Sequence, residues 1–185
     1  MNRRILIVGG HTGGHLYPAE SLARELIAGG VGTPILLEHQ RPLEQRVFNE
    51  DGMKKILAPW HAKGRFAFLS SVPAAIKLLR QHEISAVIGF GAFPSVTAGL
   101  AARCLRIPLY LHEQNRVMGK ANWFLAFLAE KVFLSSPIVS PSRNLRSKSA
   151  ILGCPIRPEF QPCEVPDAPL RCLILGGSQG AEEVN

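Results

Sequence analysis

A histidine ends a glycine-rich segment that follows a short aliphatic run near the start of the chain. The segment, residues 9–15, has the sequence GGHTGGH, and a helical pattern comes after it. Backbone N–H groups and the helix dipole at such a turn attract an anion, and glycine lets a ligand approach closely. His15 at the helix start is disfavoured as imidazolium, so it can stay neutral and accept a proton from an attacking hydroxyl group. The alternatives are a histidine that caps the turn or contacts a diphosphate.

The same segment lacks the familiar nucleotide-binding signatures. No three glycines fall at i, i+2 and i+5, as a dinucleotide fingerprint requires. Gly9 and Gly14 have the Walker A separation, but His15-Leu16 replaces the Lys-Ser/Thr pair that holds phosphate and magnesium. His11 and His15 stand four apart, yet the glycines interrupt any helix that would align them, so no metal site is expected. A tight structural turn remains an alternative explanation of the segment.

Three polar residues further along the chain could also bind a ligand or take part in a reaction. Asn115 offers an amide donor and a carbonyl acceptor, which suits sugar hydroxyls, although an asparagine that closes a turn is the alternative. Arg157 can pair with a diphosphate or a uridine, unless it is a solvated linker arginine. Glu113 ends a predicted strand, and this setting favours a buried, hydrogen-bonded carboxylate over a catalytic one.

Short β-rich runs alternate with helical periods, which is typical of a parallel α/β sheet. Because half a dozen such units follow one another, we expect a doubly wound parallel sheet with ligands at the carboxyl ends of its strands. The predicted strands are 5–8, 35–38, 55–58, 86–90, 109–112, 132–135 and 150–152, and the predicted helices are 18–28, 43–50, 73–82, 95–105 and 120–129.

The character of the sequence changes after the last of these strands. Residues 155–169 are rich in proline and have no helical or strand period, which predicts a linker after a domain of residues 1–154. Residues 170–185 contain a new strand, a GGSQG turn and the opening of a helix. We therefore expect them to begin a second α/β domain that the chain does not complete.

Composition limits the function classes. Apolar residues make up 46 % and charged residues 19 %, which indicates a globular protein, and the net charge of +7 favours anionic partners. The four cysteines match neither a metal knuckle nor a disulfide framework, so free thiols are expected. The apolar run at the N-terminus is too brief for a signal peptide, and no run approaches the length of a membrane span, so a cytoplasmic, non-spanning protein is expected.

Two stretches combine aromatic and cationic side chains, which suits an interfacial membrane patch. For the stretch on the predicted helix 120–129, burial of the aromatic side chains in the core is the favoured interpretation. The first stretch is Lys63, Arg65, Phe66, Phe68 and Leu69, and the second is Trp123, Phe124, Phe127 and Lys131.

Five motifs resemble, in order, those of MurG-type glycosyltransferases. The resemblance implies the Rossmann-like N-terminal domain of a GT-B glycosyltransferase. In such an enzyme this domain receives undecaprenyl-pyrophosphoryl-muramyl-pentapeptide, a second domain binds UDP-N-acetylglucosamine, and the sugar is transferred with inversion, without a cofactor or a tightly held metal. The motifs are GGHLYPA (13–19), GFGAFPS (89–95), HEQN (112–115), LGCPIR (152–157) and GGSQGA (176–181).

The resemblance also implies roles for individual residues. His15 would be the catalytic base or an acceptor contact. Lys63, Arg65, Phe66, Phe68 and Leu69 would face the anionic cytoplasmic surface of the membrane, and nucleic acid is not expected as a partner. The residues that would contact the nucleotide sugar are Thr12, Gly13, Gly14, Asn115, Arg157 and Ser178.

The match is incomplete, which leaves other functions open. MurG-type enzymes usually have glycine at the positions of His11 and Ala92, tyrosine at that of Phe93 and asparagine at that of Cys154. Since most of the donor-binding domain is missing, the chain alone is expected to be inactive. The alternatives are a non-catalytic, membrane-docking or partner-recruiting half of a split glycosyltransferase and a nucleotide-binding regulator.

Overall fold

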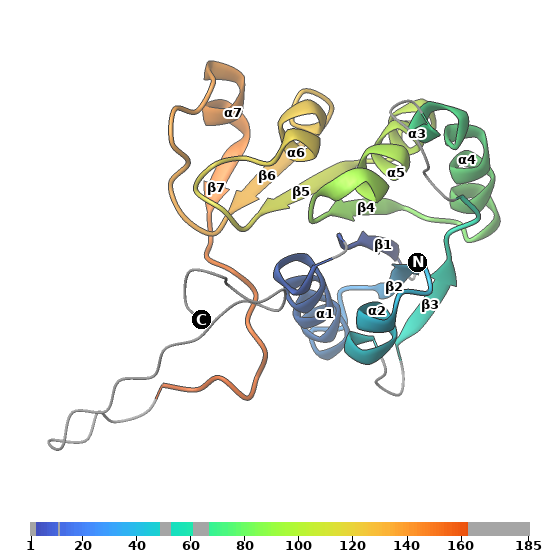
Figure 1. The fold of residues 1–185 in the computed structure, drawn as a ribbon, viewed down its shortest axis with the longest axis horizontal. Helices are drawn as coiled ribbons and strands as arrows, with labels where there is room; N and C mark the ends of the chain where they lie inside the picture. The colour runs from blue at the N-terminus through green and yellow to red at the C-terminus, as the bar shows by residue number, and fades with distance from the viewer. Residues whose placement is uncertain (1–2, 11, 49–52, 61–66, 163–185) are drawn as a thin grey trace, which may run out of the picture.

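A seven-stranded parallel sheet forms the centre of the protein (Figure 1). The computed structural model describes residues 3–10, 12–48, 53–60 and 67–162. The strands are β1 Arg4–Val8, β2 Thr33–Glu38, β3 Lys54–Leu57, β4 Ala86–Gly89, β5 Leu109–Glu113, β6 Lys131–Leu134 and β7 Ser149–Ile151. The helices are α1 Gly13–Ala28, α2 Pro42–Val47, α3 Ala67–Ser70, α4 Val72–Gln81, α5 Ala92–Cys104, α6 Lys120–Leu125 and α7 Arg143–Lys148.

The strand order is β3-β2-β1-β4-β5-β6-β7, and every pair is parallel. The chain runs outward in one direction from β1 to β3, and in the other from β4 to β7. The predicted doubly wound parallel sheet is thus confirmed. In such a sheet the crevice for a ligand lies where the order reverses, at the carboxyl ends of β1 and β4.

Helices cover both faces of the sheet. Helices α1 and α2 lie on one face, and α3 to α6 lie on the other (Figure 1). Alternate residues of β1 serve the two faces: Ile5 and Ile7 belong to the smaller buried cluster with residues of α1, and Leu6 and Val8 belong to the larger one. This double burial explains why the strand is a continuous aliphatic run.

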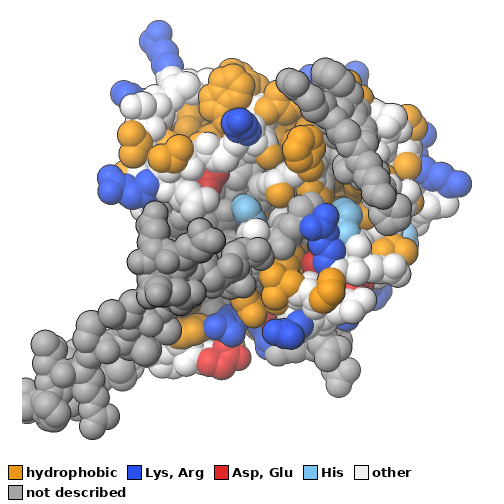
Figure 2. All heavy atoms as spheres, viewed as in Figure 1, with side chains coloured by type: hydrophobic (Ala, Val, Ile, Leu, Met, Phe, Trp, Pro, Cys, Tyr) orange, Lys and Arg blue, Asp and Glu red, His pale blue; other side chains and the backbone are white. Residues whose placement is uncertain are grey.

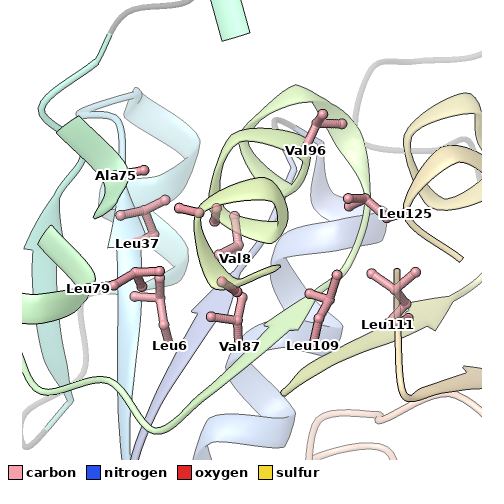
Figure 3. Close-up of a cluster of buried hydrophobic side chains, with 14 of the residues drawn as sticks. Leu6, Val8, Leu37, Ala75, Leu79, Val87, Val96, Leu109, Leu111 and Leu125 are labelled. Atoms are coloured by element: carbon pink, nitrogen blue, oxygen red, sulfur yellow. The ribbon is translucent and has the colours of Figure 1, made fainter. Parts of the chain in front are cut away.

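The larger cluster joins strands β1, β2, β4, β5 and β6 to helices α4, α5, α6 and α7. Figure 3 shows side chains of β1, β2, β4 and β5 meeting side chains of α4, α5 and α6. Leu111 at β5 and Leu125 of α6 are both fully buried there, which anchors α6 beside the carboxyl end of β5. The labelled members are Leu6, Val8, Leu37, Ala75, Leu79, Val87, Val96, Leu109, Leu111 and Leu125.

Some boundaries differ from the predictions. The first helix begins at Gly13, not near position 18, so Pro18 lies inside α1. The short helices α3 and α7 were not predicted. Within the described residues, no helix is both long and apolar enough to cross a bilayer.

Residues 155–162 form neither helix nor strand, as predicted for a linker. Residues 163–185 lie outside the described residues. The division into domains at 1–154, 155–169 and 170–185 therefore stays a prediction.

Candidate functional site

The N-terminus of α1 directly follows β1 at the point where the sheet order reverses. Thr12 is the N-cap residue, and its carbonyl accepts the N–H groups of His15 and Leu16, both at 3.0 Å. The N–H groups of Gly13 and Gly14 have no acceptor within the helix, because they belong to its first turn. This end of a 16-residue helix thus combines outward N–H groups with the positive end of the dipole.

The imidazole of His15 is held between two glycine-containing loops. Its Nδ1 lies 2.9 Å from Oγ1 of Thr12. A Cβ added to Gly10 would come within 2.7 Å of the same Nδ1, so only glycine at position 10 allows the ring to lie here. On the other side the ring meets Gly91, where φ is +103°, a value that glycine tolerates and other residues rarely adopt.

The contact with Thr12 fits either neutral tautomer of His15, because a hydroxyl group can both donate and accept. In the tautomer that carries the proton on Nδ1, this nitrogen donates to Oγ1 of Thr12, and Nε2 is the basic nitrogen. A Cβ on Gly91 would lie 3.2 Å from Nε2 of His15 and 3.5 Å from Nδ2 of Asn122. In that tautomer the basic nitrogen, Nε2, faces the loop between β4 and α5, beside the amide of Asn122.

Glu113, at the end of β5, organises the neighbouring loop. Its carboxylate accepts four hydrogen bonds: the backbone N–H and Nδ2 of Asn115 donate to Oε1 at 3.0 and 3.2 Å, and Gly119 N and Asn122 Nδ2 donate to Oε2, both at 3.0 Å. The side chain is 2 % exposed. Because both oxygens are engaged and buried, Glu113 is a structural carboxylate, as the sequence predicted.

Asn115 is exposed and lies beside this network. One N–H of its side-chain amide is used by Glu113, which leaves the second N–H and the carbonyl oxygen as possible ligand contacts. The sequence offered a second interpretation, in which Asn115 closes a turn. The structure confirms it, because the backbone N–H and the side-chain amide of Asn115 both donate to Glu113. A role in sugar binding stays a prediction.

An apolar cleft of about 430 Å³ opens at the N-terminus of α1. Arg157 lies on its wall, with the guanidinium carbon 4.6 Å from the ring centre of Tyr17 and 4.7 Å from that of Phe160. The two rings hold the cation by cation–π contacts. The cleft is lined by Gly13, Gly14, Tyr17, Pro18, Gln114, Cys154, Pro155, Ile156, Arg157 and Phe160.

His112 connects β5 to the segment that carries Arg157. Its Nε2 lies 3.1 Å from the carbonyl oxygen of Gly153, and its ring packs against Phe90 at a centroid distance of 5.2 Å. Burial lowers the pKa of His112 below its ordinary value of 6.5, against the opposing effects of the Gly153 carbonyl and the Glu113 carboxylate. A neutral His112 therefore donates through Nε2 and holds the start of this segment.

The predicted site residues fall into two neighbouring groups. Gly13, Gly14 and Arg157 line the cleft, whereas Thr12 and His15 meet at the other side of the α1 terminus. Ser178, Lys63, Arg65 and Phe66 lie outside the described residues, as does the side chain of Phe68. Leu69 is 53 % exposed.

Sequence reasoning missed the roles of three residues. Tyr17 stacks on Arg157, His112 holds Gly153, and Asn122 donates to Glu113 and to the carbonyl of His112. Asn122 is 1 % exposed. Its position among hydrophobic residues in a predicted helix is the feature of the sequence that could have indicated a buried, hydrogen-bonded role. In the described part of the chain, no group of three or more His, Cys, Asp or Glu side chains is arranged to hold a metal ion.

One prediction about α6 and the turn that follows it is wrong. The aromatic side chains Trp123, Phe124 and Phe127 were expected to be mainly core, but they are 58 %, 42 % and 53 % exposed. Asn122 and Leu125 occupy the buried side of the helix instead.

Comparison with known protein families finds a match to one model. Residues 5–134 match the glycosyltransferase family 28 N-terminal domain. This range includes every strand from β1 to β6 and both loops that hold His15.

Two curated relatives carry the name UDP-N-acetylglucosamine--N-acetylmuramyl-(pentapeptide) pyrophosphoryl-undecaprenol N-acetylglucosamine transferase. The protein from Actinobacillus pleuropneumoniae serotype 5b is 32 % identical over 203 aligned positions, which cover 100 % of this chain and 56 % of the relative. The protein from Bradyrhizobium sp. (strain BTAi1) is 35 % identical over 193 positions, which cover 96 % and 53 %. The chain thus spans about half the length of the curated relatives it matches.

Solved structures show the same fold. The crystal structure of Acinetobacter baumannii MurG superposes with a TM-score of 0.73 at 26 % identity, over 92 % of this chain and 48 % of that one. The Methanocaldococcus jannaschii UDP-GlcNAc 2-epimerase in complex with UDP-GlcNAc and UDP has a TM-score of 0.64 at 12 % identity, over 83 % and 47 %. The second likeness concerns the fold alone.

Proposed function

Because the chain belongs to glycosyltransferase family 28 and contains the N-terminal domain of that family, we propose that it is the acceptor-binding half of an N-acetylglucosaminyltransferase. The reaction is transfer of N-acetylglucosamine from UDP-N-acetylglucosamine to undecaprenyl-pyrophosphoryl-muramyl-pentapeptide. The names of the curated relatives and the crystal structure of a MurG protein support this substrate pair.

The observation that carries the proposal is the placement of His15. It lies in the first turn of α1, oriented by Thr12, where the sheet order reverses. The N–H groups of Gly13 and Gly14 bind an anion at this helix end, and the diphosphate of UDP-N-acetylglucosamine supplies one, which places the donor sugar beside His15. A sugar hydroxyl of the acceptor then lies within reach of Nε2.

In the proposed step, the acceptor oxygen attacks the anomeric carbon of the donor sugar from the face opposite UDP. The new C–O bond forms as the bond to UDP breaks, so the configuration inverts. Nε2 of His15 takes the hydroxyl proton, and UDP leaves with the electron pair of the broken bond. General base catalysis of this kind contributes about 10²–10⁴-fold to a rate.

The cleft beside Arg157 suits part of the donor. We assign donor contacts to Thr12, Gly13, Gly14, Asn115 and Arg157, and also to Ser178, which lies outside the described residues. Arg157 has an always-charged guanidinium that pairs with phosphate oxygens. Its stacking between Tyr17 and Phe160 preorganises it for this role.

Because the proposed acceptor is linked to a lipid, the protein must reach it at a membrane surface. We propose peripheral association with the cytoplasmic face of the membrane, supported by the net charge of +7 and the exposed Leu69 of α3. The proposal also assigns membrane contact to four residues on the basis of the sequence alone: Lys63, Arg65, Phe66 and Phe68.

The test is a chimeric enzyme. Residues 1–169 are joined to the carboxyl-terminal half of the Actinobacillus pleuropneumoniae relative, and transfer of radiolabelled N-acetylglucosamine to the lipid acceptor is measured. We expect transfer, and His15→Ala should lower kcat by about 10²–10⁴-fold without changing the circular dichroism spectrum. A folded chimera that binds UDP-N-acetylglucosamine but transfers no sugar would refute the proposed function, and a loss below about tenfold in the variant would refute the base.

A further inference from the structure

A segment without helix or strand leaves the end of β7 and passes α1 (Figure 1). We call residues 153–160 the strap. Among the described residues, its hydrogen bonds and ring contacts to the rest of the protein lie at its two ends. At one end the N–H of Gly153 donates to a carbonyl of β6 at 3.3 Å, and the carbonyl of Gly153 accepts from Nε2 of His112 at 3.1 Å. At the other end the guanidinium of Arg157 lies over the tyrosine ring of α1.

Between its ends the strap is exposed and stiff. Cys154 is exposed, and Ile156 is 66 % exposed, so burial of apolar surface contributes little to its position. Pro155 and Pro158 fix their own φ angles and favour an extended conformation for the residue before each of them. The middle of the strap therefore connects its two ends with little freedom to bend.

A β-turn closes the far end of the strap around Arg157. The N–H of Phe160 donates to the carbonyl of Arg157 at 3.0 Å, and Pro158 takes the second position of the turn, which proline favours. The turn brings the ring of Phe160 to 4.7 Å from the guanidinium carbon. Because the strap is stiff, the location of this arginine over α1 depends on how Gly153 is held at the near end.

Gly153 is held by a buried histidine of β5. His112 is 5 % exposed, and its ring packs on Phe90. The φ of Gly153 is +88°, which glycine adopts and other residues rarely do. A Cβ added here would meet nothing within 4 Å, so the requirement for glycine is conformational and not a matter of space. This backbone angle and the hydrogen bond from His112 together set the direction of the strap.

The far end of the strap forms part of the proposed donor site. Arg157 lines the same cleft as Gly13 and Gly14, whose N–H groups lie at the N-terminus of α1. On the face of the molecule in Figure 2, Lys and Arg side chains are more frequent than Asp and Glu side chains, which attracts anions. A planar guanidinium binds phosphate well only when it is aligned with the oxygens, so a small displacement of Arg157 lowers affinity.

We propose that His112 and Gly153 are positioning residues that set the affinity of the cleft for phosphate groups, because they hold the strap and thereby Arg157. His112 acts through the carbonyl of Gly153, and Gly153 acts through the strap, so both are distinct from the residues that line the cleft. The inference rests on the proposed function for the role of Arg157 as a phosphate contact.

Binding of pyrophosphate to the 185-residue chain tests the proposal without sugar transfer. The affinity is measured by NMR titration of the labelled protein at constant ionic strength and pH 7.5. His112→Leu removes the N–H donor and Gly153→Ala disfavours the positive φ, so each should weaken binding about 3–10-fold, the effect of one hydrogen bond. His112→Gln keeps an N–H donor and should retain the wild-type affinity. Burial lowers the pKa of His112, so these variants do not change the charge at this pH.

A double-mutant cycle separates positioning from general structural damage. Arg157→Gln alone should weaken pyrophosphate binding about tenfold or more. In this background His112→Leu should cause little further loss, because it acts through the arginine. Ile84→Ala is the control, because Ile84 is 5 % exposed in the core just before β4, at the opposite end of the sheet from the cleft. It should lower stability and leave the affinity unchanged, and circular dichroism verifies that each variant is folded.

The inference is overturned by any of three results. They are no binding of pyrophosphate, wild-type affinity in both His112→Leu and Gly153→Ala, and losses from His112→Leu and Arg157→Gln that add in the double variant. None of these measurements depends on sugar transfer, so an inactive chimeric enzyme would leave them unaffected. A chimera that transfers sugar while the losses add would keep the proposed reaction and reject the positioning role alone.

Discussion

Nδ1 of His15 lies 2.9 Å from Oγ1 of Thr12, so the residue just before α1 orients the imidazole in its first turn. Thr12→Val removes the hydroxyl at nearly constant volume. In the chimeric enzyme kcat should fall about 3–10-fold, the effect of one hydrogen bond, while Thr12→Ser should retain the wild-type value. If Thr12 also contacts the donor, KM for UDP-N-acetylglucosamine rises as well. An unchanged kcat in the valine variant would show that the contact does not orient the base.

The four hydrogen bonds to Glu113 predict a large effect on stability. Glu113→Gln replaces one acceptor oxygen with an NH2 group that faces N–H donors, so the free energy of unfolding should fall by about 1–3 kcal/mol in urea denaturation. Glu83→Gln is the control, because the ion pair of Glu83 with Arg4 is 2.7 Å long but largely exposed. Loss of this ion pair should lower the free energy of unfolding by less than about 1 kcal/mol. Equal losses in the two variants would contradict the structural role of Glu113.

His112 predicts a pH dependence of stability. Its pKa is lowered by burial, so the unfolded chain binds a proton more readily than the folded one. The stabilisation from neutral His112 is fully present above the ordinary pKa of about 6.5 and decreases as the pH falls through this value. His112→Gln keeps an N–H donor for Gly153 but does not titrate. Urea denaturation between pH 5 and 7.5 should therefore show a flatter pH profile for this variant, and an unchanged profile would contradict the assignment.

Ala92 has a φ of +63°, which favours glycine. Ala92→Gly should raise the free energy of unfolding by about 0.5–1 kcal/mol. Glycine relieves the backbone strain of the folded state, and this gain exceeds the cost of the greater entropy that glycine gives the unfolded chain. Ala74→Gly within α4 should lower it by about 0.5–1 kcal/mol. Thermal denaturation of the two variants checks the opposite signs. A destabilised Ala92→Gly would indicate that the methyl group contributes packing.

The sheet could be predicted because its central strands, such as β1 and β2, are buried on both faces and therefore form short aliphatic runs. The start of α1 could not, because Pro18 favours the first turn of a helix, and the glycines before it seemed too flexible to be helical. The short helices α3 and α7 contain too few residues for a hydrophobic period.

In the candidate site, too, some features could be predicted from the local sequence, whereas others depend on tertiary contacts. The glycine-rich turn, His15 and Arg157 could be proposed as parts of the site from residue types and from the resemblance. The outward orientation of Trp123 in α6 and of Phe127 in the turn after it could not be predicted, because their i, i+4 spacing is the same on a buried or an exposed face. Only the tertiary contacts of Asn122 and Leu125 decide which side of the helix faces inward.

Pro18 has a chemical effect at the N-terminus of α1. Proline has no N–H group, so the carbonyl oxygen of Gly14 cannot receive the usual hydrogen bond from four residues ahead. Gly14 is exposed on the wall of the cleft. The turn whose amides we propose to bind a phosphate thus also presents a free carbonyl acceptor, to which a hydroxyl group of a bound sugar could donate a hydrogen bond.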